Sequence, residues 1–229
     1  MITENQFEVL TYIERNKEQK IPQRKLAKHI EVSVGTVNKV ISDLMEMELI
    51  KESGKSLYEV TLKGYETLEP FRVRRAVFLA AGFGSRLVPI TLNTPKPLVM
   101  VKEKKIIETL LDAVIAAGIQ DIYIVRGYLK QQFDLLLDKY PMIKFIDNPL
   151  YNESNNISSA YYARHLFENA YVLESDLLLS NPQLIRKYEY HSNYLGIKKE
   201  RTDDWCFETN GHVIKSIAVG GVDCYQMVG

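Results

Sequence analysis

Hydrophobic residues near the N-terminus recur at helical spacing and predict three short helices. Thr3 and Ser33 are suited to cap the first and third helices, and Pro22 suits the first turn of the second. A polar turn over 51–56 and a short β run over 58–62 then predict a hairpin. The residues expected to face the core of this region are Phe7, Leu10, Ile13, Leu26, Ile30, Val37, Val40, Ile41 and Leu44.

This order of elements over residues 1–70 resembles the winged helix-turn-helix family. The resemblance implies that the third helix begins with polar side chains, which would meet DNA in its major groove. Residues 1–70 contain ten Lys or Arg and twelve Asp or Glu, and this negative balance does not favour DNA. The sequence therefore leaves open a DNA partner, a protein partner and a contact within the chain. The polar residues at the start of the third helix are Ser33, Thr36, Asn38 and Lys39.

The pattern changes after residue 70. A charged linker is predicted over 71–75, and a continuous apolar run over 76–81 is typical of a buried parallel strand. Helical and strand patterns alternate after it, so we predict an α/β fold, with a Rossmann-like parallel sheet that follows the small winged-helix domain. The expected helices cover 106–117, 129–137 and 158–167, and the expected strands cover 122–125, 143–146 and 170–173.

Composition excludes several classes of protein. The sequence is 46% hydrophobic and 25% charged, as in ordinary globular proteins, and its formal net charge is zero. No global field therefore attracts nucleic acid or a membrane. No apolar run approaches the about 20 residues that span a bilayer, and the charged N-terminus is not a signal peptide. Cys206 and Cys224 lack metal-ligand or CxxC spacing, which predicts reduced thiols in a cytoplasmic protein.

A glycine-rich string follows the strand predicted at 76–81. Glycines after a strand leave backbone N–H groups open to a polyphosphate. Arg86 and Lys96 add positive charges of the kind that a triphosphate requires. A plain turn would explain the two glycines alone, but it would not explain the whole string. The string is Leu79-Ala80-Ala81-Gly82-Phe83-Gly84-Ser85-Arg86-Leu87, followed by Pro89, Thr91, Pro95 and Lys96.

This string resembles the sugar-nucleotide pyrophosphorylase family of nucleotidyltransferases, and segments 148–159, 173–178, 201–207 and 225–229 resemble more narrowly the bacterial choline-phosphate cytidylyltransferases. The resemblance implies that Arg86 and Lys96 contact the nucleotide phosphates. It also implies transfer of CMP from CTP to phosphocholine, giving CDP-choline and pyrophosphate, with Mg²⁺ as the cofactor. The loop residues expected to bind the nucleotide are Leu79, Ala81, Gly82, Phe83, Gly84 and Ser85.

Further polar residues follow predicted strands. Asp176 comes after the strand at 170–173, and ligands of open α/β sheets bind at such strand ends. A carboxylate there can hold Mg²⁺, as the resemblance also implies, or can cap a turn. Glu174 faces the same side and is a weaker candidate. Asn156 and Ser158 can read the edge of a pyrimidine, but Asn-rich turns also exist for capping alone.

The single tryptophan lies in a stretch suited to bind a cation. A quaternary ammonium has charge but no hydrogen-bond donor, so aromatic faces bind it, with a carboxylate nearby. Asp203 and Asp204 precede Trp205, and Tyr194 and Tyr225 can add walls. The resemblance favours this cage for phosphocholine, whereas a core position is the commoner fate of a tryptophan.

The last residues indicate that the transferase domain predicted at 76–229 is truncated at its C-terminus. Residues 224–228 are apolar, as in the middle of a sheet, and the resemblance implies a longer domain. It also implies a second acidic metal ligand, expected beyond Gly229 because Asp203, Asp204 and Asp223 do not match its position. Two rival functions stay open: a sugar-1-phosphate nucleotidyltransferase, and a DNA-binding regulator whose transferase-like domain senses nucleotide.

Overall fold

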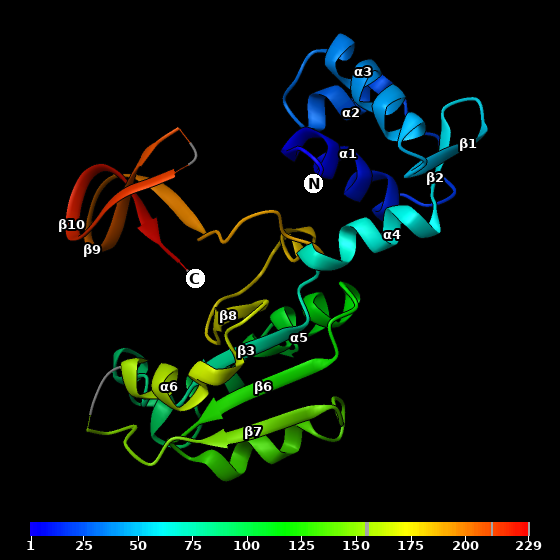
Figure 1. The fold of residues 1–229 in the computed structure, drawn as a ribbon. Coiled ribbons are helices and arrows are strands. Elements are labelled where there is room, and N and C mark those ends of the chain that lie inside the picture. Colours follow the sequence, from blue (N-terminus) through cyan, green and yellow to red (C-terminus); the bar gives the residue numbers. More distant parts are fainter. Residues whose placement is uncertain (154–155, 212, 229) are drawn as a thin grey trace. The chain divides into compact units, whose positions relative to one another are not determined.

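A computed structural model describes residues 1–153, 156–211 and 213–228 (Figure 1). Contacts divide the chain into two compact units. The first unit combines Met1–Arg72 with the later segment Tyr188–His191, and the second combines Val73–Lys187 with the residues from Ser192 onward. Each unit has its own hydrophobic core, so each is described by itself.

The first unit contains three helices, a hairpin and a fourth helix. Thr3 caps the first helix through a capping box with Gln6, and Ser33 caps the third by accepting a hydrogen bond from the Thr36 amide. These caps confirm the predicted starts of both helices. The elements are α1 (Glu4–Arg15), α2 (Gln23–His29), α3 (Val34–Glu46), β1 (Ile50–Gly54), β2 (Leu57–Val60) and α4 (Leu62–Leu68).

Helix α4 replaces the end of the predicted β run at 58–62. Strand β2 ends at Val60, because the Thr61 hydroxyl accepts a hydrogen bond from the Gly64 amide and so caps a helix. Gly64 lets this helix approach the hairpin, since a Cβ there would lie 2.3 Å from the Leu49 carbonyl oxygen. The predicted strand is therefore wrong at its last two residues.

A segment from far along the chain completes the core of the first unit. Tyr188 forms a β-bridge with Arg72 and is 5% exposed. The Tyr190 ring stacks on Phe71, with centroids 5.2 Å apart, and lies at the same distance from the Phe7 ring. The first unit thus includes residues that lie outside the range 1–70 predicted for it.

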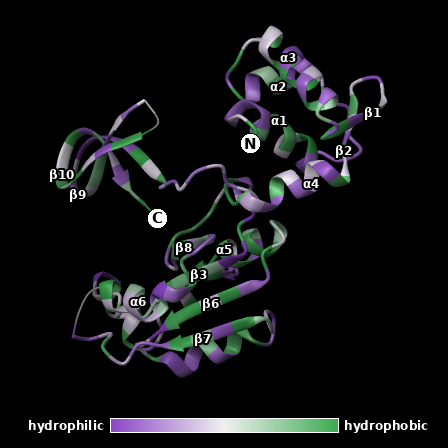
Figure 2. Cartoon of the chain, viewed as in Figure 1, coloured by the Kyte–Doolittle hydropathy of each residue, from purple (hydrophilic) through white to green (hydrophobic). Residues whose placement is uncertain are grey.

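The second unit is built on a parallel four-stranded sheet in the order β7-β6-β3-β8, which confirms the predicted α/β architecture. Its strands are rich in apolar residues, as Figure 2 shows along β6 and β7. The short strands β4 (Met100–Val101) and β5 (Lys104–Lys105) pair with each other. The main elements are β3 (Arg75–Ala80), α5 (Ile106–Ala116), β6 (Asp121–Arg126), β7 (Ile143–Asp147), α6 (Asn156–Ala163) and β8 (Ala170–Glu174).

Two helical segments differ from the prediction. The segment after β6 is a 3-10 helix, Lys130–Leu136, where an α-helix over 129–137 was expected. Leu129 has a left-handed backbone with a φ of 46°, which an α-helix does not accommodate. Helix α6 begins before the predicted range 158–167 and ends at Ala163, where a 3-10 turn follows. Among the helices of the described residues, none is long and apolar enough to cross a membrane.

A long antiparallel ribbon forms the last part of the second unit. Strands β9 (Gly196–Asn210) and β10 (Val213–Met227) pair along their lengths, with bulges that interrupt the register. Tyr225 pairs with both Lys198 and Phe207, so the ribbon curls back on itself (Figure 1). At this point the apolar C-terminal run has strand neighbours on both edges, as its pattern indicates. Cys206 and Cys224 are buried free thiols of this ribbon.

Candidate functional site

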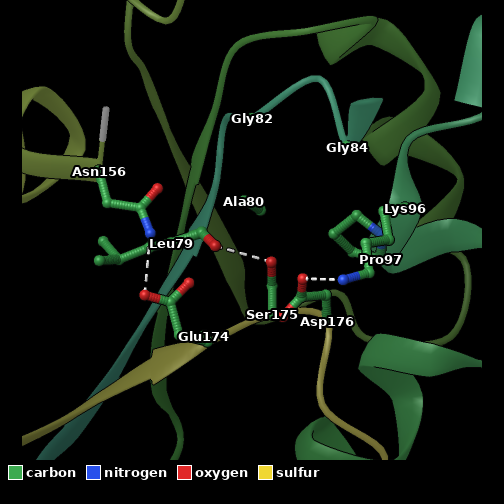
Figure 3. Close-up of a pocket in the computed structure, with 10 residues that line it drawn as sticks. All are labelled: Leu79, Ala80, Gly82, Gly84, Lys96, Pro97, Asn156, Glu174, Ser175 and Asp176. Carbon is green, nitrogen blue, oxygen red and sulfur yellow. Dashed lines mark hydrogen bonds and ion pairs between the residues drawn. The ribbon is translucent and has the colours of Figure 1, made fainter. Parts of the chain in front are cut away.

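A pocket of about 110 Å³ opens where β3 and β8 end, at the carboxyl edge of the sheet (Figure 3). Open α/β sheets commonly bind ligands at this edge, because the loops that follow the strands converge there. The pocket contains residues of the glycine string together with polar residues from α6 and from the end of β8. It is lined by Leu79, Ala80, Gly82, Gly84, Lys96, Pro97, Asn156, Glu174, Ser175 and Asp176.

The two glycines of the loop have different structural roles. Gly84 has a left-handed backbone with a φ of 69°, and a Cβ there would lie 3.1 Å from the Lys96 Cβ. Thr91 holds the same turn, because its buried hydroxyl donates to the Gly84 carbonyl over 3.0 Å. A Cβ on Gly82 would meet no atom within 4 Å. The fold therefore requires Gly84, whereas Gly82 leaves its backbone open toward the pocket.

Other predicted loop residues lie around these glycines. The Ala81 carbonyl accepts a hydrogen bond from the Tyr128 amide over 3.1 Å, and the Phe83 ring meets the Tyr128 ring edge-on at 4.7 Å. Ser85 and Arg86 are exposed in a 3-10 turn. Within the described residues, Arg86 does not line the pocket and makes no ion pair. Its exposed guanidinium is therefore available to a ligand.

The predicted phosphate-binding lysine and the predicted metal-binding carboxylate lie together. The Lys96 ammonium forms an ion pair with Asp176, and their side chains are 33% and 32% exposed (Figure 3). Ser175 donates its hydroxyl to the Leu79 carbonyl over 2.7 Å and so fixes the end of β8 beside β3. Sequence reasoning missed Ser175, although its position just after the strand predicted at 170–173 was a usable signal.

Glu174 is the second carboxylate of the pocket. The Asn156 side-chain amide donates to one Glu174 oxygen over 2.9 Å, and the two side chains point toward each other in Figure 3. Burial and then the negative charge of Asp176 raise the pKa of Glu174, although the hydrogen bond from Asn156 opposes that shift. The structure therefore assigns the Asn156 amide to a carboxylate, where sequence reasoning expected it to read a base.

Ser158, the other predicted base-reading residue, is held inside the fold. It is buried at the start of α6, and its hydroxyl accepts a hydrogen bond from the Asn148 amide over 2.9 Å. Asn148 also donates to Ser159, and its own oxygen accepts from the Leu150 amide. Sequence reasoning missed Asn148, which orders the turn after β7 through these bonds. Ser158 thus has a structural partner, and it does not line the pocket.

The predicted aromatic cage is not assembled around Trp205. Tyr194 meets Phe207 edge-on at 6.2 Å, and Phe207 stacks on Tyr225 at 5.6 Å. In the described part of the ribbon, no ring contact joins Trp205 to either tyrosine, and Trp205 is 56% exposed. Both tyrosines instead contact Phe207, which lies two residues after Trp205 in β9. The Asp204 carboxylate accepts a hydrogen bond from the Trp205 amide over 2.8 Å.

Tyr194 lies within electrostatic range of the pocket. Partial burial and then the charge of Glu174 raise the pKa of its hydroxyl. Tyr194 lies two residues before Gly196, the first residue of the ribbon. Gly196 allows the Phe207 ring to approach this point, since a Cβ there would lie 2.4 Å from that ring. The charge of Glu174 thus acts on Tyr194, although Tyr194 does not line the pocket.

The residues of the pocket suit one kind of magnesium site, in which the protein supplies few of the ligands. In the parts of the chain that the structure describes, no group of three or more His, Cys, Asp or Glu side chains converges to hold a metal. Mg²⁺ in nucleotide sites is commonly held by one or two carboxylates together with waters and substrate phosphates. Asp176, with Glu174 near it in the pocket, supplies that smaller set.

Two protein families match the chain. The model of the family described as Nucleotidyl transferase matches residues 75–195, which is more than half of the sequence. The model of the MarR family matches residues 2–54. The first match includes every residue of the pocket, and the second includes helices α1 to α3.

Two curated proteins and one solved structure to which the chain is similar are cytidylyltransferases by name. The 2-aminoethylphosphonate cytidylyltransferase of Lancefieldella rimae is 40% identical over 67% of this chain and 64% of its own. The choline-phosphate cytidylyltransferase of Streptococcus pneumoniae is 39% identical over 57% of each chain. A solved structure of CTP:phosphocholine cytidylyltransferase from that species has a TM-score of 0.63 and 34% identity, over 69% of this chain and 68% of that one. The chain spans about three fifths of the length of these curated relatives.

Proposed function

The chain belongs to the nucleotidyl transferase family, and from this we propose that it transfers a cytidylyl group from CTP to a small phosphate or phosphonate acceptor. The observation that carries the proposal is the pocket at the ends of β3 and β8, where an open glycine backbone, a lysine and a carboxylate meet. The names of the Lancefieldella and Streptococcus relatives support CTP as the nucleotide.

The proposed reaction is an in-line displacement at the α-phosphorus of CTP. An acceptor oxygen forms a bond to that phosphorus, the bond to the β-phosphate breaks, and pyrophosphate leaves. Because the acceptor oxygen is already ionised, no general base is needed, and catalysis depends on positioning and charge neutralisation. The backbone amides around Gly82 receive the phosphates, and Lys96 neutralises charge on the α-phosphate or the acceptor. Arg86 binds the outer phosphates.

Mg²⁺ is the cofactor that fits this proposal, and Asp176 is the residue that would hold it. When bound, the ion neutralises phosphate charge and orients the substrates. Lys96 and Asp176 pair with each other, so neither partly buried charge is left uncompensated. On CTP binding, Lys96 would take a phosphate and Asp176 the metal in place of this partner.

Two acceptors with a cationic nitrogen are candidates. Phosphocholine is supported by the Streptococcus relative, and 2-aminoethylphosphonate is supported by the Lancefieldella relative. Phosphocholine requires aromatic faces, and Trp205 would have to supply one from its exposed position. If Trp205 binds phosphocholine, Trp205→Ala should raise the KM for phosphocholine about tenfold and leave the KM for CTP unchanged.

A substrate panel tests the proposed function. Pyrophosphate release would be measured with CTP, UTP or dTTP against phosphocholine, 2-aminoethylphosphonate and glucose-1-phosphate, each with Mg²⁺. The expected result is release with CTP and an acceptor that carries a cationic nitrogen. Turnover of glucose-1-phosphate with UTP or dTTP would move the protein to the sugar branch. No release with any pair would refute a transferase function for this chain.

A second function concerns the first unit and rests on the MarR match at residues 2–54. Asn38 and Lys39 are exposed near the start of α3, where such a helix would meet a major groove. We propose that this surface binds DNA. The test is a titration of the protein against its own upstream DNA and against random DNA, each at two salt concentrations. Specific binding should weaken steeply with salt. Equal affinity for both DNAs would favour a protein partner instead.

A further inference from the structure

The two carboxylates of the pocket differ in their partners. Asp176 pairs with the Lys96 ammonium. Glu174 receives one hydrogen bond, from the Asn156 amide to its Oε1, and within the described residues no Lys or Arg pairs with it. Its second oxygen accepts no bond from those residues. Glu174 is therefore a half-buried carboxylate, fixed in orientation, and the Lys96 charge that acts on it belongs to an ion pair with Asp176.

The surroundings of Glu174 determine which cation would suit it. Among the described residues that line the pocket around Glu174, none is aromatic. A quaternary ammonium has no N–H and needs several aromatic faces around it. A primary ammonium has three donors and needs oxygen acceptors, one of which the Oε2 of Glu174 provides.

We infer that Glu174, oriented by Asn156, is the specificity-determining residue that binds a primary ammonium group of the acceptor. This inference rests on the proposed function and deepens it, because it assigns the acceptor to one chemical class. That class is a small phosphonate or phosphate monoester with a primary ammonium at its other end. Asn156 acts as a positioning residue, since its amide holds Oε1 and leaves Oε2 for the substrate.

The test compares acceptors that differ at the nitrogen. These are 2-aminoethylphosphonate, phosphoethanolamine, phosphocholine and propylphosphonate, in which a methyl group replaces the ammonium. With saturating CTP and Mg²⁺, the two primary ammonium acceptors should have kcat/KM values about tenfold or more above the others. The ratio between these two shows whether the phosphonate or the phosphate is preferred. A wild type that prefers phosphocholine would overturn the inference.

Glu174→Gln supplies the second arm, because it removes the charge and keeps the shape. It should raise the KM for both primary ammonium acceptors about tenfold or more, and so lower their kcat/KM relative to that of propylphosphonate by the same factor. Asn156→Ala should produce a smaller rise in the same KM. Glu168→Gln, an exposed carboxylate on the turn before β8, is the matched control and should change nothing. Thermal unfolding of each variant verifies that it is folded.

Two results would overturn the assignment of Glu174. An equal loss for all four acceptors that excess Mg²⁺ restores would make Glu174 a metal ligand beside Asp176. An unchanged KM for the primary ammonium acceptors would place the ammonium elsewhere. Failure of the proposed function has a different signature, since the wild type would then release no pyrophosphate from any acceptor, and the inference would fall with it.

Discussion

Replacing each loop glycine by alanine separates what the fold requires from what a ligand requires. At Gly84 the alanine would adopt a φ of 69° and place its Cβ 3.1 Å from Lys96 and 3.2 Å from Thr91. The left-handed backbone costs about 1–2 kcal/mol for a residue with a side chain. Because the second unit has roughly 150 residues, Gly84→Ala should lower its Tm by about 2–8 °C.

Gly82→Ala should leave the fold intact, because a Cβ there meets no atom within 4 Å. Alanine also restricts the unfolded chain, so the free energy of unfolding should stay equal or rise by up to about 1 kcal/mol. The added methyl group would instead occupy the space through which a phosphate reaches the backbone amides. The affinity for CTP should therefore fall about tenfold or more.

Thermal unfolding and calorimetric titration with CTP measure both effects on the same samples. The expected pattern is a lowered Tm for Gly84→Ala, and a normal Tm with weak CTP binding for Gly82→Ala. Wild-type CTP affinity in Gly82→Ala would refute the reasoning, because it would mean that no phosphate approaches this part of the loop. A clearly lowered Tm in Gly82→Ala would contradict the claim that the fold does not need this glycine.

Three further predictions follow from the described contacts. Lys96→Ala should lower kcat/KM by about a hundredfold or more, since it removes charge stabilisation in the pocket, and near wild-type turnover would exclude that role. Asp176→Asn should abolish Mg²⁺-dependent turnover while circular dichroism shows an intact fold, and a retained Mg²⁺ dependence would place the ligand elsewhere. Tyr188→Ala should destabilise the first unit by about 3–5 kcal/mol, measured by denaturant unfolding, whereas Tyr161→Ala, at a 60% exposed position, should have little effect.

The sequence predicted those helices and strands that are determined by residues close to them in the chain, such as a helix cap or a continuous apolar run. Thr3 and Ser33 cap their helices from adjacent positions, and continuous apolar runs identify the strands β3, β6 and β8. Helix α4 shows the limit, because the Thr61 cap competes with a β pattern that begins three residues earlier. The packing of Tyr188 on the first unit could not be predicted, since its partners are more than a hundred residues away in the sequence.

The candidate site also contains residues whose positions the sequence predicted and residues whose partners it did not. Strand ends converge in a parallel sheet, so the pattern sufficed to bring the glycine loop, Lys96 and Asp176 together. Asn156 bonds to Glu174 and Ser158 bonds to Asn148, and both partners belong to other elements of the fold. The periodicity of apolar residues does not reveal which polar side chains of different elements meet. The expected enclosure of Trp205 failed because both tyrosines contact Phe207, and the pairing of Tyr225 with Phe207 across the ribbon is not visible in a pattern of apolar residues.

The N-terminal unit is not complete when its first 72 residues leave the ribosome. Tyr188 and Tyr190 are synthesised more than a hundred residues later, a delay of roughly 5–25 s at about 5–20 residues per second. All four strands of the parallel sheet emerge within that interval. Until then the Phe7 and Phe71 rings lack the tyrosine that stacks against them. Their apolar faces therefore stay without this cover on the nascent chain until the segment Tyr188–His191 has been synthesised.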